Sequence, residues 1–196
     1  MSTYSDIFDA VEKGTVNDAR YFVEQKRVDV NTRNARGSNP LHFAVDNPDI
    51  EVVKYLISKG ANVNAENGGG YTPLYCAVRE NCSVEVLKTL VSLGADVNVK
   101  DNENGMTPIF YAVTNGKTEN IKCLANLGAD VNAKDNKGAT PAFYAVLAGK
   151  IESLECLKNL GARLDARDKD GNSLLDMTFI TNQTRIREWL HANGVR

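Results

Sequence analysis

The chain has 196 residues, of which 23 are Lys or Arg and 25 are Asp or Glu, so its formal net charge is −2. Hydrophobic residues make up 42% of it and charged residues 24%, which is typical of a folded globular protein. The near-neutral charge argues against a nucleic-acid binder, which needs clustered Lys and Arg. No apolar run approaches the roughly 18 residues of a membrane span, and the first residues lack the basic and apolar regions of a secretory leader. We therefore expect a cytoplasmic protein without nucleic-acid or membrane partners.

The four cysteines show neither the spacing nor the neighbouring histidines of a metal site. Cys123 and Cys156 lie 33 residues apart in similar surroundings, Ile-Lys-Cys-Leu and Leu-Glu-Cys-Leu. Both are predicted to be small buried hydrophobes on helices, since each adjoins a Leu of an apolar helix face. We expect neither a metal nor a cofactor.

Two motifs recur with a period of about 33 residues, which is the sequence pattern of a repeat protein. The first is a Pro that follows Asn or Thr, at positions 40, 73, 108 and 141. The second is Gly-Ala-x-Val-Asn or a close variant, which begins at positions 60, 94, 128 and 161. Six units fill the chain, and we predict one domain over 1–196. The predicted units are approximately 1–33, 34–66, 67–100, 101–134, 135–167 and 168–196.

Within each unit the sequence predicts a helix, a turn, a second helix and a loop. The Thr or Asn before each Pro caps the first helix, and Pro stands where no backbone donor is needed. One helix pair cannot bury both apolar faces, so successive units must stack. The first and last units are degenerate and are predicted to cap the stack. The apolar residues expected to anchor these two caps are Phe8, Tyr21 and Phe22 in the first and Phe179, Ile186, Trp189 and Leu190 in the last.

This pattern resembles the ankyrin repeat. The opening motif Gly-x-Thr-Pro-Leu-His-x-Ala of that family appears as residues 70–77, 105–112 and 138–145, and the Gly-Ala-Asp-Val-Asn ending is the second motif above. The resemblance implies an all-α solenoid of stacked helix-turn-helix units with short hairpin-like loops. The motif His is retained only as His42, where the family makes a polar contact to loop backbone. Apolar packing is expected where Tyr75, Phe110 and Phe143 replace it.

The resemblance also implies that a protein partner meets the concave face, formed by loop tips and first helices. The position just before each first helix, two residues before the Pro, and the positions three and six after the Pro are predicted to face this side. Aromatic and apolar residues there are candidates for partner contact, because such residues are enriched in interfaces. The candidates are Tyr71, Met106, Tyr111, Tyr144, Leu147 and Ile180. Packing between repeats is the alternative interpretation, which is strongest for Tyr111 and Tyr144.

No arrangement of nucleophile and base is evident, so we expect a protein-binding chain rather than an enzyme. An adaptor or scaffold is the main hypothesis, and an inhibitor that occludes the active site of an enzyme is the alternative. An enzyme is a remote third possibility that no sequence feature supports. The partner cannot be named from the sequence, and the chain is expected to be a monomer. By family resemblance, Asn64, Asn98 and Asn132 are also candidate substrates of an asparaginyl hydroxylase.

Overall fold

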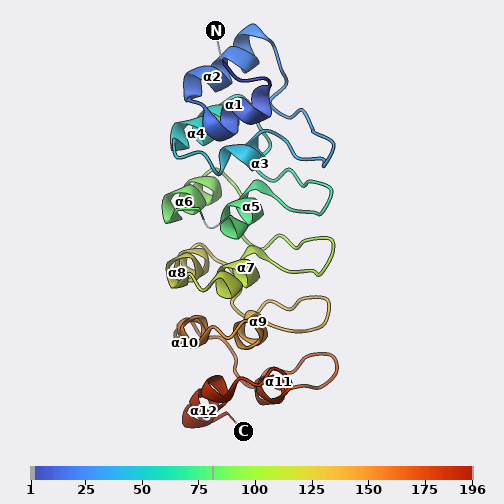
Figure 1. Cartoon of the computed structure of the whole chain (residues 1–196), viewed down its shortest axis with the longest axis vertical. Helices are drawn as coiled ribbons and strands as arrows, with labels where there is room; N and C mark the ends of the chain where they lie inside the picture. Colours follow the sequence, from blue (N-terminus) through green and yellow to red (C-terminus); the bar gives the residue numbers. More distant parts are fainter. Residues whose placement is uncertain (1–2, 81, 196) are drawn as a thin grey trace. The chain divides into compact units, whose positions relative to one another are not determined.

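The computed structural model describes residues 3–80 and 82–195, and the regular secondary structure of those residues is helical. Twelve α-helices and one π-helical turn occur in this part of the chain, together with one isolated bridge between Arg167 and Ser173. The residues form two compact units, one up to Asp96 and one from Val97 onward. The helical architecture predicted from the repeats is confirmed (Figure 1).

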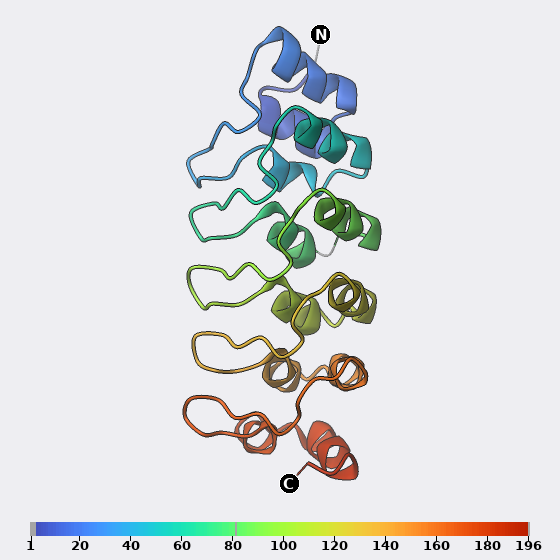
Figure 2. The ribbon, with the colours of Figure 1, turned by 180° about the vertical axis from the view of Figure 1, so that it is seen from behind.

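In the first unit, two layers of helices lie side by side, and loops between the repeats project beyond them (Figures 1 and 2). Helix α1 contacts α3, and α3 contacts α5, while α2 contacts α4 in the second layer. The elements of this unit are α1 (Ile7–Lys13), α2 (Val16–Arg20), η1 (Tyr21–Gln25), α3 (Leu41–Ala44), α4 (Ile50–Ser58), α5 (Pro73–Arg79) and α6 (Val84–Ser92).

The second unit is built in the same way, with first helices in one layer and second helices in the other (Figure 2). Helix α9 contacts α7 on one side and α11 on the other, and α8 contacts α10. The helices are α7 (Pro108–Asn115), α8 (Thr118–Asn126), α9 (Pro141–Leu147), α10 (Ile151–Asn159), α11 (Leu174–Ile180) and α12 (Thr184–Ala192).

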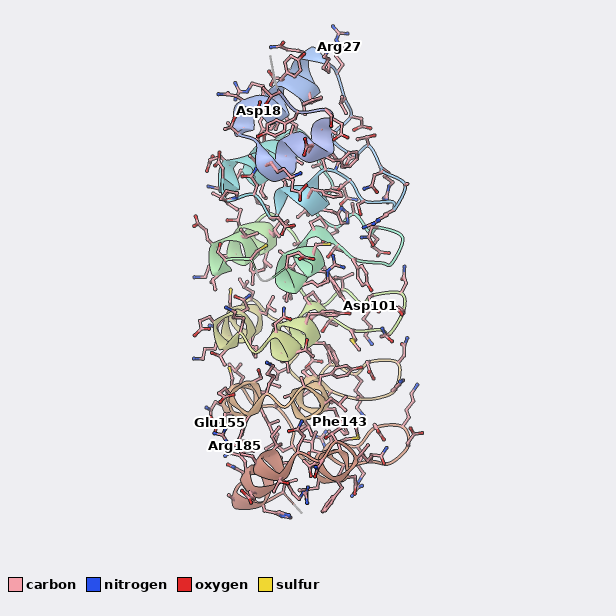
Figure 3. All side chains as sticks on the ribbon, in the orientation of Figure 1. Asp18, Arg27, Asp101, Phe143, Glu155 and Arg185 are labelled. Carbon is pink, nitrogen blue, oxygen red and sulfur yellow. The ribbon has the colours of Figure 1, made fainter. Side chains whose placement is uncertain are left out.

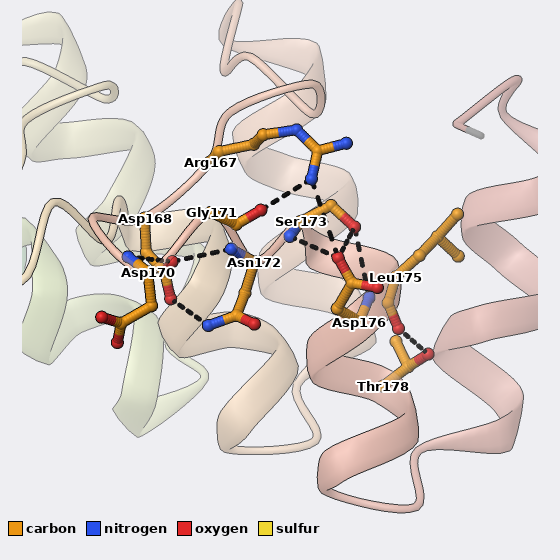
Figure 4. Close-up of polar contacts among 9 residues, drawn as sticks. All are labelled: Arg167, Asp168, Asp170, Gly171, Asn172, Ser173, Leu175, Asp176 and Thr178. Atoms are coloured by element: carbon orange, nitrogen blue, oxygen red, sulfur yellow. Dashed lines mark hydrogen bonds and ion pairs between the residues drawn. The ribbon is translucent and has the colours of Figure 1, made fainter.

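The ends of the first helices follow the predicted capping chemistry. In α5, the Thr72 hydroxyl accepts a hydrogen bond from the backbone N–H of Tyr75, and Pro73 opens the helix. In α11, Ser173 and Asp176 form a reciprocal capping box: the Ser173 backbone N–H donates to the Asp176 carboxylate at 2.7 Å, and the Asp176 N–H donates back to the Ser173 hydroxyl (Figure 4). Helix α7 ends at Gly116, whose φ of 75° lies in the left-handed region that favours glycine.

Each unit has its own apolar core between the two layers. The side chains at the motif-His position, Tyr75, Phe110 and Phe143, are fully buried, so the predicted apolar packing there is confirmed. Figure 3 shows Phe143 inside the helix layers, whereas Glu155 and Arg185 lie on the outer side of α10 and α12. Other large side chains that are fully buried include Leu41, Leu56, Leu74, Leu87, Leu90, Ile109, Ile121, Leu124, Leu154, Leu157, Leu174 and Leu190.

Three of the seven predicted anchors of the end repeats are buried. In the first repeat Phe22 is buried, and Phe8 packs edge-on against Phe43 with 5.4 Å between the ring centroids. In the last repeat Ile186 and Leu190 are buried. Phe8, Tyr21 and Trp189 are half-buried. The prediction for Phe179 is wrong, because 62% of its surface is exposed.

Asparagine side chains connect successive repeats within each unit. The amide of Asn64 donates to the carbonyl oxygen of Gly94 at 2.8 Å, and its oxygen accepts from the Asp96 N–H at 2.8 Å. This pair of bonds joins the end of one repeat to the end of the next. The same two bonds are made by Asn31 to Gly60 and Asn62, by Asn98 to Gly128 and Asp130, and by Asn132 to Gly161 and Arg163.

Candidate functional site

The predicted contact residue in the first unit is Tyr71, which stands at a loop tip just before α5. Its ring is half-buried and stacks on Tyr75 with 4.5 Å between the centroids, and the Arg79 guanidinium lies 5.7 Å from the centroid of the Tyr71 ring. The Tyr71 carbonyl oxygen accepts a hydrogen bond from Nε2 of His42 at 2.9 Å. The expected contact of this histidine to loop backbone is therefore confirmed.

Tyr71 borders a groove of about 440 Å³ in the first unit that the sequence analysis missed. Phe43 and Tyr71 supply its aromatic surface, and charged residues of both signs surround them. The sequence places these residues in three different repeats, so the pattern of a single repeat contains no sign of the groove. Its charged lining residues are Glu12, Arg36, Asp46, Arg79 and Glu80.

The acidic part of this groove is centred on Asp46, which follows α3. Burial raises the pKa of the Asp46 carboxyl, and the negative charges of Glu80 and Glu12 raise it further, against a hydrogen bond from the Cys82 thiol that lowers it. Arg79 is engaged with Glu80, since its Nε lies 2.9 Å from the Glu80 carboxylate. The groove therefore combines aromatic surface with a locally negative end.

In the second unit, the residue two positions before the first Pro is buried. Met106 is only 9% exposed, so the prediction that it belongs to an exposed stripe is wrong. The loop is closed by the Asp101 N–H, which donates to the Met106 carbonyl oxygen at 2.9 Å, as the Asn67 N–H donates to the carbonyl oxygen of the half-buried Tyr71. The matched residues Ser38 and Ala139 are buried as well.

The two tyrosines of the second unit are half-buried. The Tyr144 hydroxyl donates to the Asp135 carboxylate at 2.9 Å, and its ring meets Phe110 edge-on with 5.3 Å between the centroids. Burial, and then the hydrogen bond to Asp135, raise the pKa of the Tyr144 hydroxyl well above its ordinary value. Tyr144 therefore has a packing role, although part of its ring and part of Tyr111 remain open to a partner.

Leu147 and Ile180 are exposed, as predicted, with 42% and 67% of their surfaces accessible. Each is the last residue of a first helix, α9 and α11, and these two helices contact each other. Leu147 lies on an uncharged helix, since α9, like α7, contains no acidic or basic residue, whereas α11, which ends at Ile180, contains Asp176 in its first turn. The second unit thus presents aliphatic and aromatic side chains where the first unit presents charges.

Comparison with known proteins shows to which family the chain belongs. A family model described as ankyrin repeats in three copies matches residues 7–101 and 93–170, which together cover most of the chain. The chain belongs to the ankyrin repeat family. The resemblance inferred from the opening and closing motifs is therefore confirmed, and ankyrin repeats are protein–protein interaction modules.

Curated relatives match segments of this ankyrin chain. One is alpha-latrocrustotoxin-Lt1a of Latrodectus tredecimguttatus, 46% identical over 68 residues, which are 35% of this chain and 5% of the toxin. An ankyrin repeat protein of Rickettsia bellii is 32% identical over 79 residues, 38% of this chain and 47% of that protein. The ankyrin repeat protein OPG189 of monkeypox virus is 37% identical over 67 residues, 34% of this chain and 12% of the viral protein. The matched segments thus span less than half the length of each relative.

The cysteines of the ankyrin chain are thiols within the repeats. None of the four described cysteines is in a disulfide, and Cys123 and Cys156 are buried as predicted. Burial raises the pKa of the Cys76 thiol to about 11 and that of Cys82 to about 12, so both are protonated at neutral pH. Among the residues that the structure describes, no group of three or more His, Cys, Asp and Glu side chains is placed to hold a metal ion. None of the described helices has the length and apolar character needed to cross a membrane.

Proposed function

We propose that this ankyrin repeat chain is a non-catalytic module that binds a protein partner and acts as an adaptor or scaffold. The observation that supports the proposal is the exposure of Leu147 and Ile180 at the ends of two adjacent helices of the second unit. Tyr144 lies three residues before Leu147, and Tyr111 holds the position of Tyr144 in the preceding repeat. Both tyrosines extend the same surface. In the first unit, Tyr71 and the groove beside it form a second, separate contact region.

Physical chemistry favours a partner over water at Leu147 and Ile180. Burying a whole aliphatic side chain is worth about 1.5–3 kcal/mol, so covering these partly exposed residues gains roughly 1–2 kcal/mol each. Folding gains nothing from leaving them in water. Half-buried tyrosines add rigid contact area at little entropic cost, which is why interfaces use them.

The proposal includes a cytoplasmic location and a monomeric state. None of the four cysteines is in a disulfide, and Cys123 and Cys156, on second helices, are each only 6% exposed. This suits a reducing compartment in which disulfides do not form. Size measurement of the purified chain over a range of concentrations tests the monomeric state directly.

The contact surface is tested by affinity purification with two baits. The first bait is the wild-type chain, and the second carries Leu147→Asp with Ile180→Asp. A matched control bait carries Asn126→Asp with Asn159→Asp, which adds the same charge at exposed ends of α8 and α10. We expect the wild type and the control to capture the same partner and the double variant to lose it. Capture by all three baits would place the contact elsewhere.

The same purification separates the two candidate roles. If the captured partner is an enzyme whose activity falls as this chain is added, the chain is an inhibitor. An unchanged activity, together with co-capture of a further protein, identifies an adaptor or scaffold.

A further inference from the structure

The last repeat differs from the one before it at three core positions. In α9 and α10 these positions are held by Ala145, Val146 and Leu154, all of which are fully buried. In α11 and α12 the residues thirty-three further along are Thr178, Phe179 and Arg187. The apolar set is thus replaced by one hydroxyl, one large ring and one cation.

The three replacements contact one another. The Arg187 guanidinium carbon lies 4.0 Å from the centroid of the Phe179 ring, the close stacking that suits a cation on an aromatic face. Arg187 Nε donates to the Thr178 hydroxyl at 3.2 Å, and its Nη2 donates to the Thr178 carbonyl oxygen at 3.4 Å. Thr178 is itself buried, and its hydroxyl donates to the Leu175 carbonyl oxygen at 2.7 Å (Figure 4). Arg187 is therefore held in one orientation on the ring.

No acidic side chain among the described residues neutralises the Arg187 guanidinium. Arg187 makes no ion pair with any residue that the structure describes. It has five N–H donors, and the contacts to Thr178 use two of them. Beside it, Phe179 is 62% exposed and Ile180 is 67% exposed. A fixed, unpaired cation thus stands within exposed apolar surface.

We infer that the face formed by Phe179 and Arg187 docks a partner segment that carries a carboxylate next to a large apolar side chain. Arginine binds carboxylates through paired hydrogen bonds, and stacking on Phe179 already orders the guanidinium for this contact. The apolar neighbour of the carboxylate covers the Phe179 ring. A purely apolar occupant, such as a helix face like that of α9, would bury the cation without a counter-charge, which is costly.

This face adjoins the surface of the proposed function at Ile180, but the two depend on different residues. The proposed contact surface depends on Leu147 and Ile180, whereas docking on this face depends on Phe179 and Arg187. The two inferences therefore fail separately: Leu147→Asp tests only the first, and Arg187→Gln tests only the second.

The probe is a phage-displayed library of random seven-residue peptides selected against the immobilised full chain. We expect the selected peptides to be enriched in Asp or Glu adjacent to Leu, Ile or Phe. Synthetic versions should bind at least tenfold more weakly to Arg187→Gln and to Phe179→Ala than to the wild type. Arg185→Gln is the matched control, because it removes an exposed cation from the same helix and should leave binding unchanged.

A change in the peptide tests the same contact without any risk that a protein variant has unfolded. Replacing the carboxylate of a selected peptide by its amide leaves the chain untouched and should weaken binding to the same extent as Arg187→Gln. Three results would overturn the inference: no enrichment of acidic residues, binding that survives both protein variants, or equal affinity for the acid and amide peptides. Concentration-dependent self-association lost in Arg187→Gln would also overturn it, because a second copy would then be the occupant.

Discussion

The side-chain amide of Asn98 donates a hydrogen bond to the carbonyl oxygen of Gly128, 3.0 Å away and thirty residues further along the chain. The oxygen of the same side chain accepts from the Asp130 N–H at 2.9 Å. One side chain thus joins the end of one repeat to the end of the next. Coupling between neighbours is what distributes stability along a repeat protein.

Asn98→Ala removes both of these bonds. Since a typical net hydrogen bond contributes about 0.5–1.5 kcal/mol and this site is exposed, we expect the free energy of unfolding to fall by about 1–2 kcal/mol. Urea denaturation followed by circular dichroism measures the change. Asn126→Ala, at the exposed end of α8, is the control and should shift the free energy by less than about 0.5 kcal/mol. Equal effects of the two substitutions would show that the bridge adds no stability.

The same bridges bear on the expected hydroxylation of Asn64, Asn98 and Asn132. In each residue both the amide and the oxygen are hydrogen-bonded, so the side chain must leave its bridge before an enzyme can reach it. We expect incubation with an asparaginyl hydroxylase to add oxygen mass at these three positions and not at Asn126. Mild warming should accelerate the reaction by opening the bridges. Mass spectrometry that finds no added oxygen would refute the prediction.

Stability should also fall in mild acid because of His42. Burial lowers its pKa below the ordinary value, although the hydrogen bonds to the backbone of Tyr71 and Asn39 oppose the shift. The unfolded chain therefore binds a proton more readily than the folded chain below about pH 6.5, so the contribution is present above that pH and is lost as the pH falls.

The measurement is the free energy of unfolding at pH 8 and pH 5 for the wild type and for His42→Tyr, which installs the residue found at the matched position 75. We expect the wild type to lose more stability than the variant between the two pH values. His191→Gln, on the exposed side of α12, is the control and should behave as the wild type does. Parallel pH profiles for wild type and His42→Tyr would contradict the assignment.

Removing residues 171–196 should destabilise what remains. Helix α11 packs on α9, so its loss exposes Val146, which is fully buried in the intact chain. We expect the shortened chain to melt at a much lower temperature or to become insoluble. Unchanged melting and solubility would show that α11 and α12 do not protect the fifth repeat.

Much of the fold was predictable because helix starts and core positions recur with the repeat. The Thr-Pro pairs predict where first helices begin. Counting from the Pro position then predicts that Leu147 and Ile180 lie on the exposed side. Burial at Met106 was not predictable from the repeat, because the matched Tyr71 is half-buried although its loop closes through the same backbone bond. Phe179 was mispredicted for a related reason: an apolar residue at a core position is buried only if another element covers it.

The groove beside Tyr71 and the pairing of Phe179 with Arg187 also lay beyond the sequence pattern. The groove gathers Glu12, Asp46 and Glu80 from three repeats, and the pair joins two helices of one repeat. A comparison of matched positions does reveal that Arg187 replaces Leu154. It does not reveal that the two new side chains contact each other.

Amide hydrogen exchange on the chain, free and bound to its captured partner, tests the proposed contact surface most directly. We predict slower exchange on binding in the last turns of α9 and α11, around Leu147 and Ile180, with unchanged exchange in α8 and α10. Slower exchange confined to the loop around Tyr71, or to the second helices, would contradict the account.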